Sequence, residues 1–180
     1  MTKILLHICC APCGAYVVER LKEDGFEPVV FFSNDNIMPR EEYFKREQEV
    51  RDYFARKNIE VIVDDYSPKD WLDQVEKLKL SKEPEGGKRC LFCYDWRLLK
   101  TAQRAKEIGI EHFATTLTIS PHKKADEINV LGQKIADQNK LTYLDSNWKK
   151  KEGYKQSCQI AREENFYRQN YCGCCFSVRY

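Results

Sequence analysis

Short apolar runs alternate with segments of helical periodicity along most of the chain. Apolar runs predict five strands, at Lys3–Ile8, Glu27–Phe32, Ile59–Val63, His112–Thr116 and Leu141–Leu144. Apolar positions three and four residues apart predict helices at Gly14–Asp24, Arg40–Asn58, Lys69–Leu80, Leu91–Ile108, Lys123–Asn139 and Gly153–Asn165. Strands that alternate with helices are typical of a parallel sheet with right-handed crossovers. We therefore expect an α/β, Rossmann-like three-layer sandwich with a parallel sheet of four to five strands.

Three cysteines follow the first predicted strand directly. Cys9, Cys10 and Cys13 are expected in the turn between this strand and the next helix. In open α/β sheets, ligands bind outside the carboxyl ends of the strands. The helix N-terminus also favours anions, and the thiolate is the form of cysteine that binds metals. We therefore expect this turn to be the centre of the functional site, with other cysteines brought to it.

Length and composition favour one globular domain. The chain has 180 residues, of which 42% are hydrophobic and 32% charged. We expect residues 1–180 to form a single α/β domain in which a cysteine-rich tail, 167–180, closes over the site. No apolar run approaches the roughly 18 residues that a membrane span needs. The first residues show no cleavage pattern, so we expect no signal peptide, no membrane contact and a cytoplasmic location.

The nine cysteines are clustered rather than scattered. In a reducing compartment they are not expected to form structural disulfides. Cys158 stands alone and is typical of a buried apolar residue. The pair Cys90-x-x-Cys93 fits a thioredoxin-like redox pair, half a zinc site or half an iron–sulfur site. Together with Cys9 and Cys10 it supplies four thiolates, which can hold zinc or a [4Fe–4S] cluster.

A third cysteine pair lies near the C-terminus. The Cys-x-Cys spacing of Cys172 and Cys174, with a glycine between them, fits a small strained disulfide of the catalytic or regulatory kind. The alternative is two more metal ligands from one loop. Near the Cys90 pair, Arg89 and Arg97 could offset thiolate charge or bind a phosphate, and surface salt bridges are the simpler interpretation.

The net charge of +2 hides an uneven distribution. Lys149–Lys151 is a basic run and Lys123-Lys124 is a smaller basic patch. Such runs are commonly solvated surface, but basic residues beside aromatic ones also suit RNA. Five aromatic residues near basic positions are candidates for stacking on bases, although any one of them could belong to the core: Trp96, Trp148, Tyr154, Tyr167 and Tyr171.

Several motifs in the same order resemble the epoxyqueuosine reductases of the QueH family. They are His7-Ile8-Cys9-Cys10-Ala11-Pro12-Cys13, Phe32-Ser33-Asn34-Asp35-Asn36-Ile37, Cys90-x-x-Cys93, Thr115-Thr116-Leu117-x-x-Ser120-Pro121 and Tyr167-Arg168-Gln169-x-Tyr171-Cys172-Gly173-Cys174. The resemblance runs from Lys3 to Val178. It implies an iron–sulfur oxidoreductase that reduces epoxyqueuosine at the tRNA wobble position to queuosine, the last step of queuosine biosynthesis, with electrons from a small protein or another reductant.

The resemblance also implies site residues. The ligands of a [4Fe–4S] cluster fall on Cys9, Cys10, Cys90 and Cys93. Cys172 and Cys174 fall on a paired redox or second-metal position, and Cys13 could serve an additional iron beside the cluster, so these three are the implied catalytic cysteines. The family is similar to PP-loop (HUP-like) nucleotide-binding proteins, but a turn without glycine before Gly14 is a poor phosphate cradle, and we expect no ATP use.

The chemistry itself leaves room for other interpretations. Reducing the epoxide to an alkene needs two electrons and two protons. Asp35, His122 and Tyr171 are candidate proton donors by their position in polar turns, but such side chains more commonly satisfy the turn backbone, so the structural interpretation is favoured for each. One rival is a zinc-stapled RNA-binding module, in which four cysteines only hold the fold. Another is a metal-free thiol–disulfide oxidoreductase that works through Cys172 and Cys174.

Overall fold

The computed structural model describes residues 1–178, and residues 179–180 of the tail lie outside the described part. The strands are β1 Thr2–Ile8, β2 Phe26–Phe32, β3 Val61–Val63, β4 His112–Thr115 and β5 Thr142–Tyr143. The α-helices are α1 Ala11–Glu23, α2 Arg40–Arg56, α3 Pro68–Lys77, α4 Lys88–Glu107, α5 Ala125–Asn139 and α6 Gly153–Glu163. Two short 3-10 helices, η1 Thr116–Ile119 and η2 Cys175–Ser177, complete the described part.

The five strands form one parallel sheet in the order β3-β2-β1-β4-β5. The central strand β1 is covered on both faces, and residues Ile4 to Ile8 are fully buried, which explains its continuous apolar run. His7 of β1 is level with Phe31 of β2 and Thr115 of β4. The predicted α/β fold with up to five parallel strands is confirmed.

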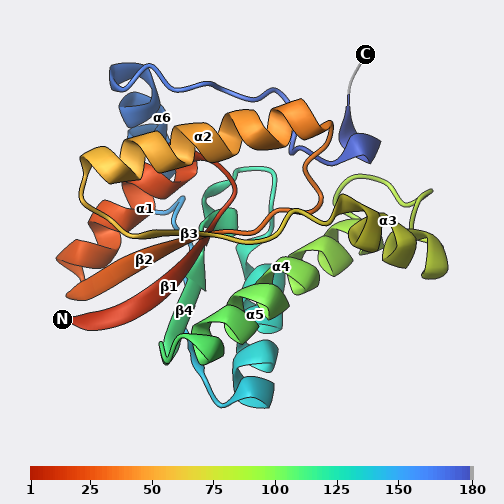
Figure 1. Ribbon diagram of the computed structural model, residues 1–180, viewed down its shortest axis with the longest axis horizontal. Coiled ribbons are helices and arrows are strands. Elements are labelled where there is room, and N and C mark those ends of the chain that lie inside the picture. The colour runs from red at the N-terminus through yellow and green to blue at the C-terminus, as the bar shows by residue number, and fades with distance from the viewer. Residues whose placement is uncertain (179–180) are drawn as a thin grey trace.

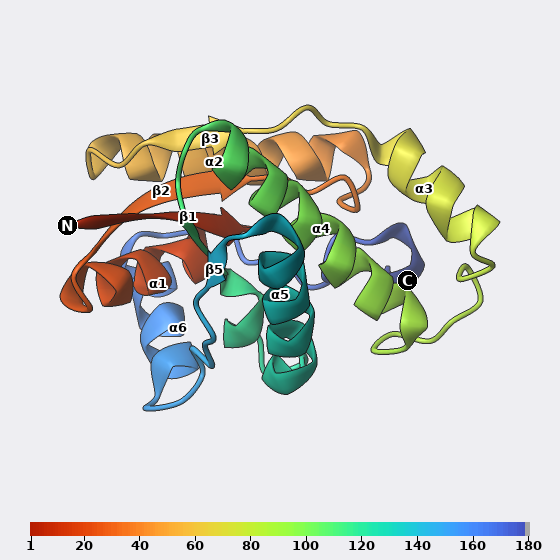
Figure 2. The same ribbon diagram turned by 90° about the horizontal axis from the view of Figure 1, so that it is seen from below.

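Helices cover the sheet on both sides (Figure 1). Residues of α1, α2 and α6 form one core against the sheet, and residues of α4 and α5 form a second core on the opposite face. A third, smaller cluster joins Trp71 and Val75 of α3 to Cys93 and Cys174. The short η2 helix accordingly lies beside α3 and the start of α4 in both views (Figure 2). The sandwich thus leaves the chain's last described residues next to the second cysteine pair.

Two helices begin three residues earlier than their spacing predicts, and both changes affect cysteines. Helix α1 begins at Ala11 rather than Gly14, because Pro12 fits the first helical turn, where its missing N–H is not needed. Cys13 therefore lies on the helix rather than in the turn. Helix α4 begins at Lys88 rather than Leu91, so Cys90 and Cys93 lie one turn apart on the same helical face.

The carboxyl ends of β1, β2 and β4 meet at one edge of the sheet. The loop after β2 is pinned there, since the Asn34 amide donates to the Ile8 carbonyl at 2.9 Å. His7 bridges the strands, with Nδ1 2.9 Å from Thr115 Oγ1 and Nε2 3.2 Å from the Ser33 carbonyl. Burial lowers the pKa of His7 to about 4, so this histidine is a neutral structural link. Among the described residues, no helix has the length and apolarity to cross a membrane.

Candidate functional site

Three thiols form a tight group where β1 ends and α1 begins. The sulfurs of Cys9, Cys10 and Cys13 all lie within 4.8 Å of one another, and those of Cys9 and Cys10 are 3.8 Å apart. The extended backbone at Cys10 turns the chain from strand to helix, and the helix then carries Cys13 back to the same point. Local geometry alone therefore assembles a triad of soft metal ligands.

The three thiols share protons unequally. Hydrogen bonds from Cys10 and Cys13 hold the pKa of Cys9 well below its ordinary value, and Lys123 and Arg97 add to this effect by their positive charge. Hydrogen bonds of Cys13 with Cys10 and Cys9, together with burial, hold the pKa of Cys13 well above its ordinary value. A single thiolate at Cys9 is thus favoured, and ionising all three thiols requires a cation to bind them.

Cys90 and Cys93 line a small cavity next to the triad. This space of about 40 Å³ is also lined by Cys172 and Cys174. It adjoins a cavity of about 360 Å³ whose wall includes Cys9, Cys13 and again Cys172. His122 and Lys123 line both cavities. The fold therefore brings residues of all three cysteine clusters to two cavities that share part of their walls.

The triad and the helical pair do not form one tight group. Within residues 1–178, Cys9, Cys10 and Cys13 are the only set of three or more potential ligands that converge on one point. Cys90 is half-buried and Cys93 is buried on α4. Arg97 interacts electrostatically with Cys93 of this pair and with Cys9 of the triad. A shared four-thiolate site made by Cys9, Cys10, Cys90 and Cys93 stays a prediction.

A buried cation faces the thiols. Arg97 is 4% exposed, and its side chain donates to the Cys93 carbonyl and the Asn34 amide oxygen, both at 3.4 Å. Within the described chain no carboxylate pairs with this guanidinium. Although burial opposes it, the nearby thiols of Cys93, Cys9 and Cys172 raise the pKa of Arg97.

A buried guanidinium without a carboxylate partner is costly unless an anion lies beside it. The groups that face Arg97 become anionic when they are thiolates or thiolate ligands of a metal. The donor set, all sulfur, is the kind that selects zinc or iron–sulfur clusters. The residues around the cavity therefore fit a thiolate-bound metal group. The surface salt bridge considered for Arg97 in the sequence is wrong, because the residue is buried.

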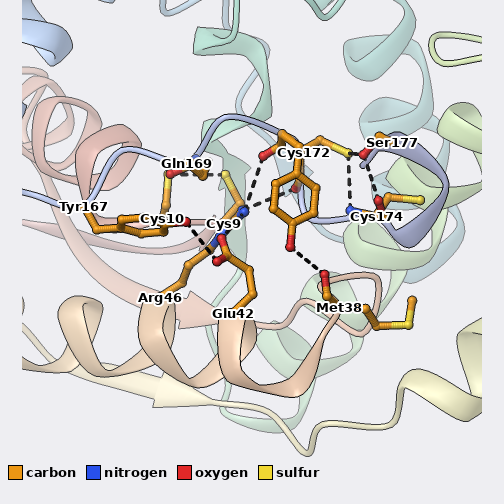
Figure 3. A network of polar contacts seen from close by, with 11 residues as sticks. Cys9, Cys10, Met38, Glu42, Arg46, Tyr167, Gln169, Cys172, Cys174 and Ser177 are labelled. Carbon is orange, nitrogen blue, oxygen red and sulfur yellow. Dashed lines mark hydrogen bonds and ion pairs between the residues drawn. The ribbon is translucent and has the colours of Figure 1, made fainter. Parts of the chain in front are cut away.

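The tail reaches this region through contacts with helix α2 (Figure 3). Arg46 is 1% exposed, pairs with Glu42 at 2.6 Å, and donates to the carbonyl oxygens of Cys172 at 3.3 Å and Tyr171 at 3.4 Å. The Tyr171 hydroxyl donates to the Met38 carbonyl at 2.6 Å. Side chains of the sandwich therefore bind the backbone of the tail.

Gly173 makes the close approach of the tail possible. Its φ is +103°, and a Cβ there would lie 2.8 Å from Ile37 Cγ1. Its carbonyl accepts a hydrogen bond from the Met38 backbone N–H at 2.8 Å. The glycine between the two tail cysteines is thus needed for packing as well as for a tight turn.

Gln169 links the tail directly to the triad. Its amide Nε2 lies 3.2 Å from Cys10 Sγ, across 159 residues of sequence. Sequence reasoning did not single out this residue, although it lies three positions before Cys172 within the tail motif. Hydrogen bonds to a metal-bound sulfur tune the metal's potential. Gln169 is placed to act on Cys10 in that way.

The tail cysteines are free thiols in this structure. The Cys172 sulfur lies 3.0 Å from Ser177 Oγ, and the Cys174 backbone N–H donates to it at 3.5 Å. Hydrogen bonding to Cys172 lowers the pKa of Cys174, but hydrogen bonding to Cys175 and burial have the larger opposite effect, and the net result is a pKa raised to about 12. The neighbouring Cys175 is exposed, and hydrogen bonding from Cys174 lowers its pKa to about 7. Cys158 lies on α6 outside both cavities.

The candidate proton donors and Arg89 differ in whether their polar atoms are already used in hydrogen bonds within the protein. Asp35 accepts from Lys100 at 2.8 Å and from Trp96 at 2.9 Å, so its carboxylate is occupied in the loop after β2. Arg89, also buried, donates to backbone carbonyls before α4. Exposed His122 lies at the cavity wall. Of the possible proton donors, His122 and Tyr171 both line the larger cavity, and the Tyr171 hydroxyl is bound to the Met38 carbonyl.

The basic run at 149–151 is not uniform. Lys149 donates to the carbonyl oxygens of Ser120, at 3.2 Å, and of Lys123. It therefore holds the turn that carries His122 and Lys123 to the cavity, while Lys150 and Lys151 are exposed. The run combines one structural lysine with two solvated ones.

Comparison with known proteins agrees over nearly the whole chain. The model of the family described as epoxyqueuosine reductase QueH matches residues 4–180. Among similar curated proteins, the epoxyqueuosine reductase QueH of Streptococcus pyogenes serotype M1 is 41% identical over 98% of this chain and 70% of its own length. The one from Staphylococcus aureus (strain Mu50) is 40% identical over 98% and 75%, and the one from Thermotoga maritima is 34% identical over 99% and 91%.

A solved structure shares the fold. It is described as a predicted subunit of tRNA methyltransferase from Methanocaldococcus jannaschii, and it superposes with a TM-score of 0.60 over 91% of this chain and 76% of that chain. The sequence identity is 16%, so this likeness supports the three-layer α/β architecture alone.

Proposed function

The chain belongs to the epoxyqueuosine reductase QueH family, and on that basis we propose that it is an oxidoreductase acting on tRNA that reduces epoxyqueuosine at the wobble position to queuosine. The reaction consumes two electrons and two protons, breaks both C–O bonds of the epoxide, forms an alkene and releases water. The electrons come from a small donor protein or another reductant. This is the last step of queuosine biosynthesis, and a cytoplasmic location suits a tRNA substrate.

The observation that supports this proposal best is the convergence of three cysteine clusters around Arg97. The proposed ligands of a [4Fe–4S] cluster are Cys9, Cys10, Cys90 and Cys93. When bound, such a cluster supplies electrons one at a time. Arg97 would balance the negative charge of its thiolates from within the core.

A two-electron reduction by a one-electron carrier needs a second centre. Cys172 and Cys174 are proposed for this role, either as a dithiol that is oxidised to a disulfide as it releases two electrons and two protons, or as ligands of a further iron with Cys13. Cys172 lines both cavities, so it is placed between the helical pair and the triad. Lys123, at the wall of both cavities, would stabilise negative charge that develops on the epoxide oxygen.

The experiment is anaerobic purification followed by iron, zinc and sulfide analysis, electron paramagnetic resonance, and reduction of tRNA that carries epoxyqueuosine. We expect about four or more iron atoms per chain and conversion of the nucleoside to queuosine. A colourless protein that holds only zinc would favour the zinc-stapled RNA-binding module.

A matched pair of variants separates the remaining rival. Cys90→Ser should lose iron and activity, while Cys158→Ser, outside both cavities, should keep its iron. Full activity in Cys90→Ser would instead favour a metal-free thiol–disulfide oxidoreductase.

The affinity for tRNA should also fall as salt rises, because phosphate contacts release counterions. A flat salt response would count against phosphate contacts.

A further inference from the structure

The five aromatic residues near basic positions in the sequence differ in how far the structure exposes their side chains. Four of them are only partly exposed and use their polar atoms within the protein. Trp148 donates to the Thr115 carbonyl at 2.9 Å, and Tyr167 donates to Glu42 at 3.0 Å. Trp96 and Tyr171 are bound to Asp35 and Met38 as described above. These four rings are held by the sandwich and its tail.

Tyr154 differs from the other four in its exposure, although its hydroxyl is also hydrogen-bonded within the protein, to Cys158. It is 41% exposed and lines the cavity of about 360 Å³ whose wall includes Cys9 and Cys13. It lies in the first turn of α6. An exposed ring beside a reactive site has a free face for a planar ligand.

The backbone that carries Tyr154 is fixed by close packing. A Cβ at Gly153 would lie 1.9 Å from the Trp148 carbonyl oxygen and 2.8 Å from the Tyr16 hydroxyl. Only glycine allows α6 to begin this close to both residues. The ring is therefore exposed on a rigid base, which lowers the entropic cost of stacking a ligand on it.

Positive charge flanks the ring. Arg168 is exposed, acts electrostatically on the Tyr154 hydroxyl, and donates to the Cys158 sulfur, one helical turn after Tyr154, at 3.8 Å. Lys123 lines the same cavity. An aromatic ring with basic residues near it is a usual arrangement for binding single-stranded nucleic acid, in which bases stack and phosphates pair with basic residues.

We propose that Tyr154 is the platform on which one unpaired nucleobase next to the modified nucleotide stacks, with Arg168 and Lys123 facing the adjoining phosphates. This inference rests on the proposed function, because it takes the anticodon loop as the substrate. Stacking there would hold the loop while the modified base enters the cavity beside the triad.

The test uses an RNA hairpin with an anticodon stem-loop sequence that carries 2-aminopurine beside the wobble position. Binding to the purified full chain should quench its fluorescence, because a stacked fluorescent base is quenched by the ring. Tyr154→Phe should keep both quenching and affinity. Tyr154→Ala should lose the quenching and bind about tenfold to a hundredfold more weakly, as expected for one base–aromatic stack.

Phe44→Ala is the matched control. Phe44 is also aromatic and 43% exposed, but it lines a different groove, between α2 and the segment after β3. This variant should bind and quench like the wild type. Wild-type quenching in Tyr154→Ala, or an equal loss in Phe44→Ala, would overturn the inference.

Binding and catalysis give separate answers. The hairpin assay needs no epoxide and no reductant, so quenching that depends on Tyr154 supports the stacking site whatever the reductase assay shows. A wild-type protein that binds the hairpin through Tyr154 but never reduces modified tRNA would contradict the proposed reaction alone. A wild-type protein that reduces tRNA while Tyr154→Ala keeps full quenching would contradict the stacking site alone.

Discussion

The triad and the tail hold their thiols by different means. Cys9, Cys10 and Cys13 are carried by the end of a buried strand and the first turn of a helix, so their positions follow from regular backbone structure. Cys172 and Cys174 lie in an irregular segment that α2 holds by side-chain contacts to its backbone. The triad is part of the regular backbone structure around the sheet, whereas the tail is held by a few side-chain contacts and one backbone hydrogen bond, from Met38 to Gly173.

The difference suggests a division of tasks. A preorganised group of thiols suits a permanent metal ligand set, because no ordering is needed when the metal binds. A docked segment can move away without unfolding the sheet. Such mobility suits cysteines that cycle between redox states, and it would also allow the tail to open the site for a large substrate. Gln169 joins the two regions through its contact with Cys10.

The largest expected effect is a difference in iron content between a variant of the triad and a variant of the tail. Cys9→Ser should lose both iron and turnover, because it removes a ligand from the triad. Cys174→Ser should retain iron while losing turnover, because it removes only the second redox centre. Iron analysis beside single-turnover reduction of modified tRNA measures both. Unchanged turnover in Cys174→Ser would remove the tail pair from the mechanism.

The next effect concerns how the tail is held. Arg46→Gln leaves Glu42, which is 10% exposed, without its cation, and removes charged donors from two tail carbonyls. Breaking a buried pair in this way should lower the free energy of unfolding by about 3 kcal/mol. Urea unfolding measures this cost, and hydrogen exchange should show faster exchange at tail amides than at those of β1.

Arg51→Gln is the control for that change. Arg51 pairs with Glu47 on the same helix at 2.7 Å, but its side chain is 47% exposed. Loss of such a pair should change the free energy of unfolding by less than about 1 kcal/mol. Equal costs for the two variants would show that Arg46 is not a special contact between α2 and the tail.

The smallest effect concerns the link between the two regions. Gln169→Leu removes the hydrogen bond to Cys10 and should leave the iron content unchanged. A bond worth about 1 kcal/mol corresponds to roughly 40 mV for a one-electron couple, and its loss should lower the reduction potential, because the bond stabilises the more negative state. Redox titration followed by electron paramagnetic resonance measures the shift. An unchanged potential would mean that Gln169 only packs against the triad.

Much of the architecture was predictable because it depends on local patterns. The five strands and six helices lie where apolar periodicity predicts them, and the triad follows directly from one strand–helix junction. The starts of α1 and α4 were wrong by three residues, because Pro12 and Gly87 permit earlier helical turns than the apolar pattern shows. That error matters for Cys13, Cys90 and Cys93, which lie on helices.

The sequence by itself therefore determined the α/β order, the central buried strand and the three thiols at its end, since each depends on neighbours within a few residues. Only the tertiary structure decided the sheet order, the burial of Arg97 among thiols, the contact of Gln169 with Cys10, and which aromatic ring stays exposed. These features join residues far apart in the chain. They depend on how packed layers place side chains in space, which local periodicity does not encode.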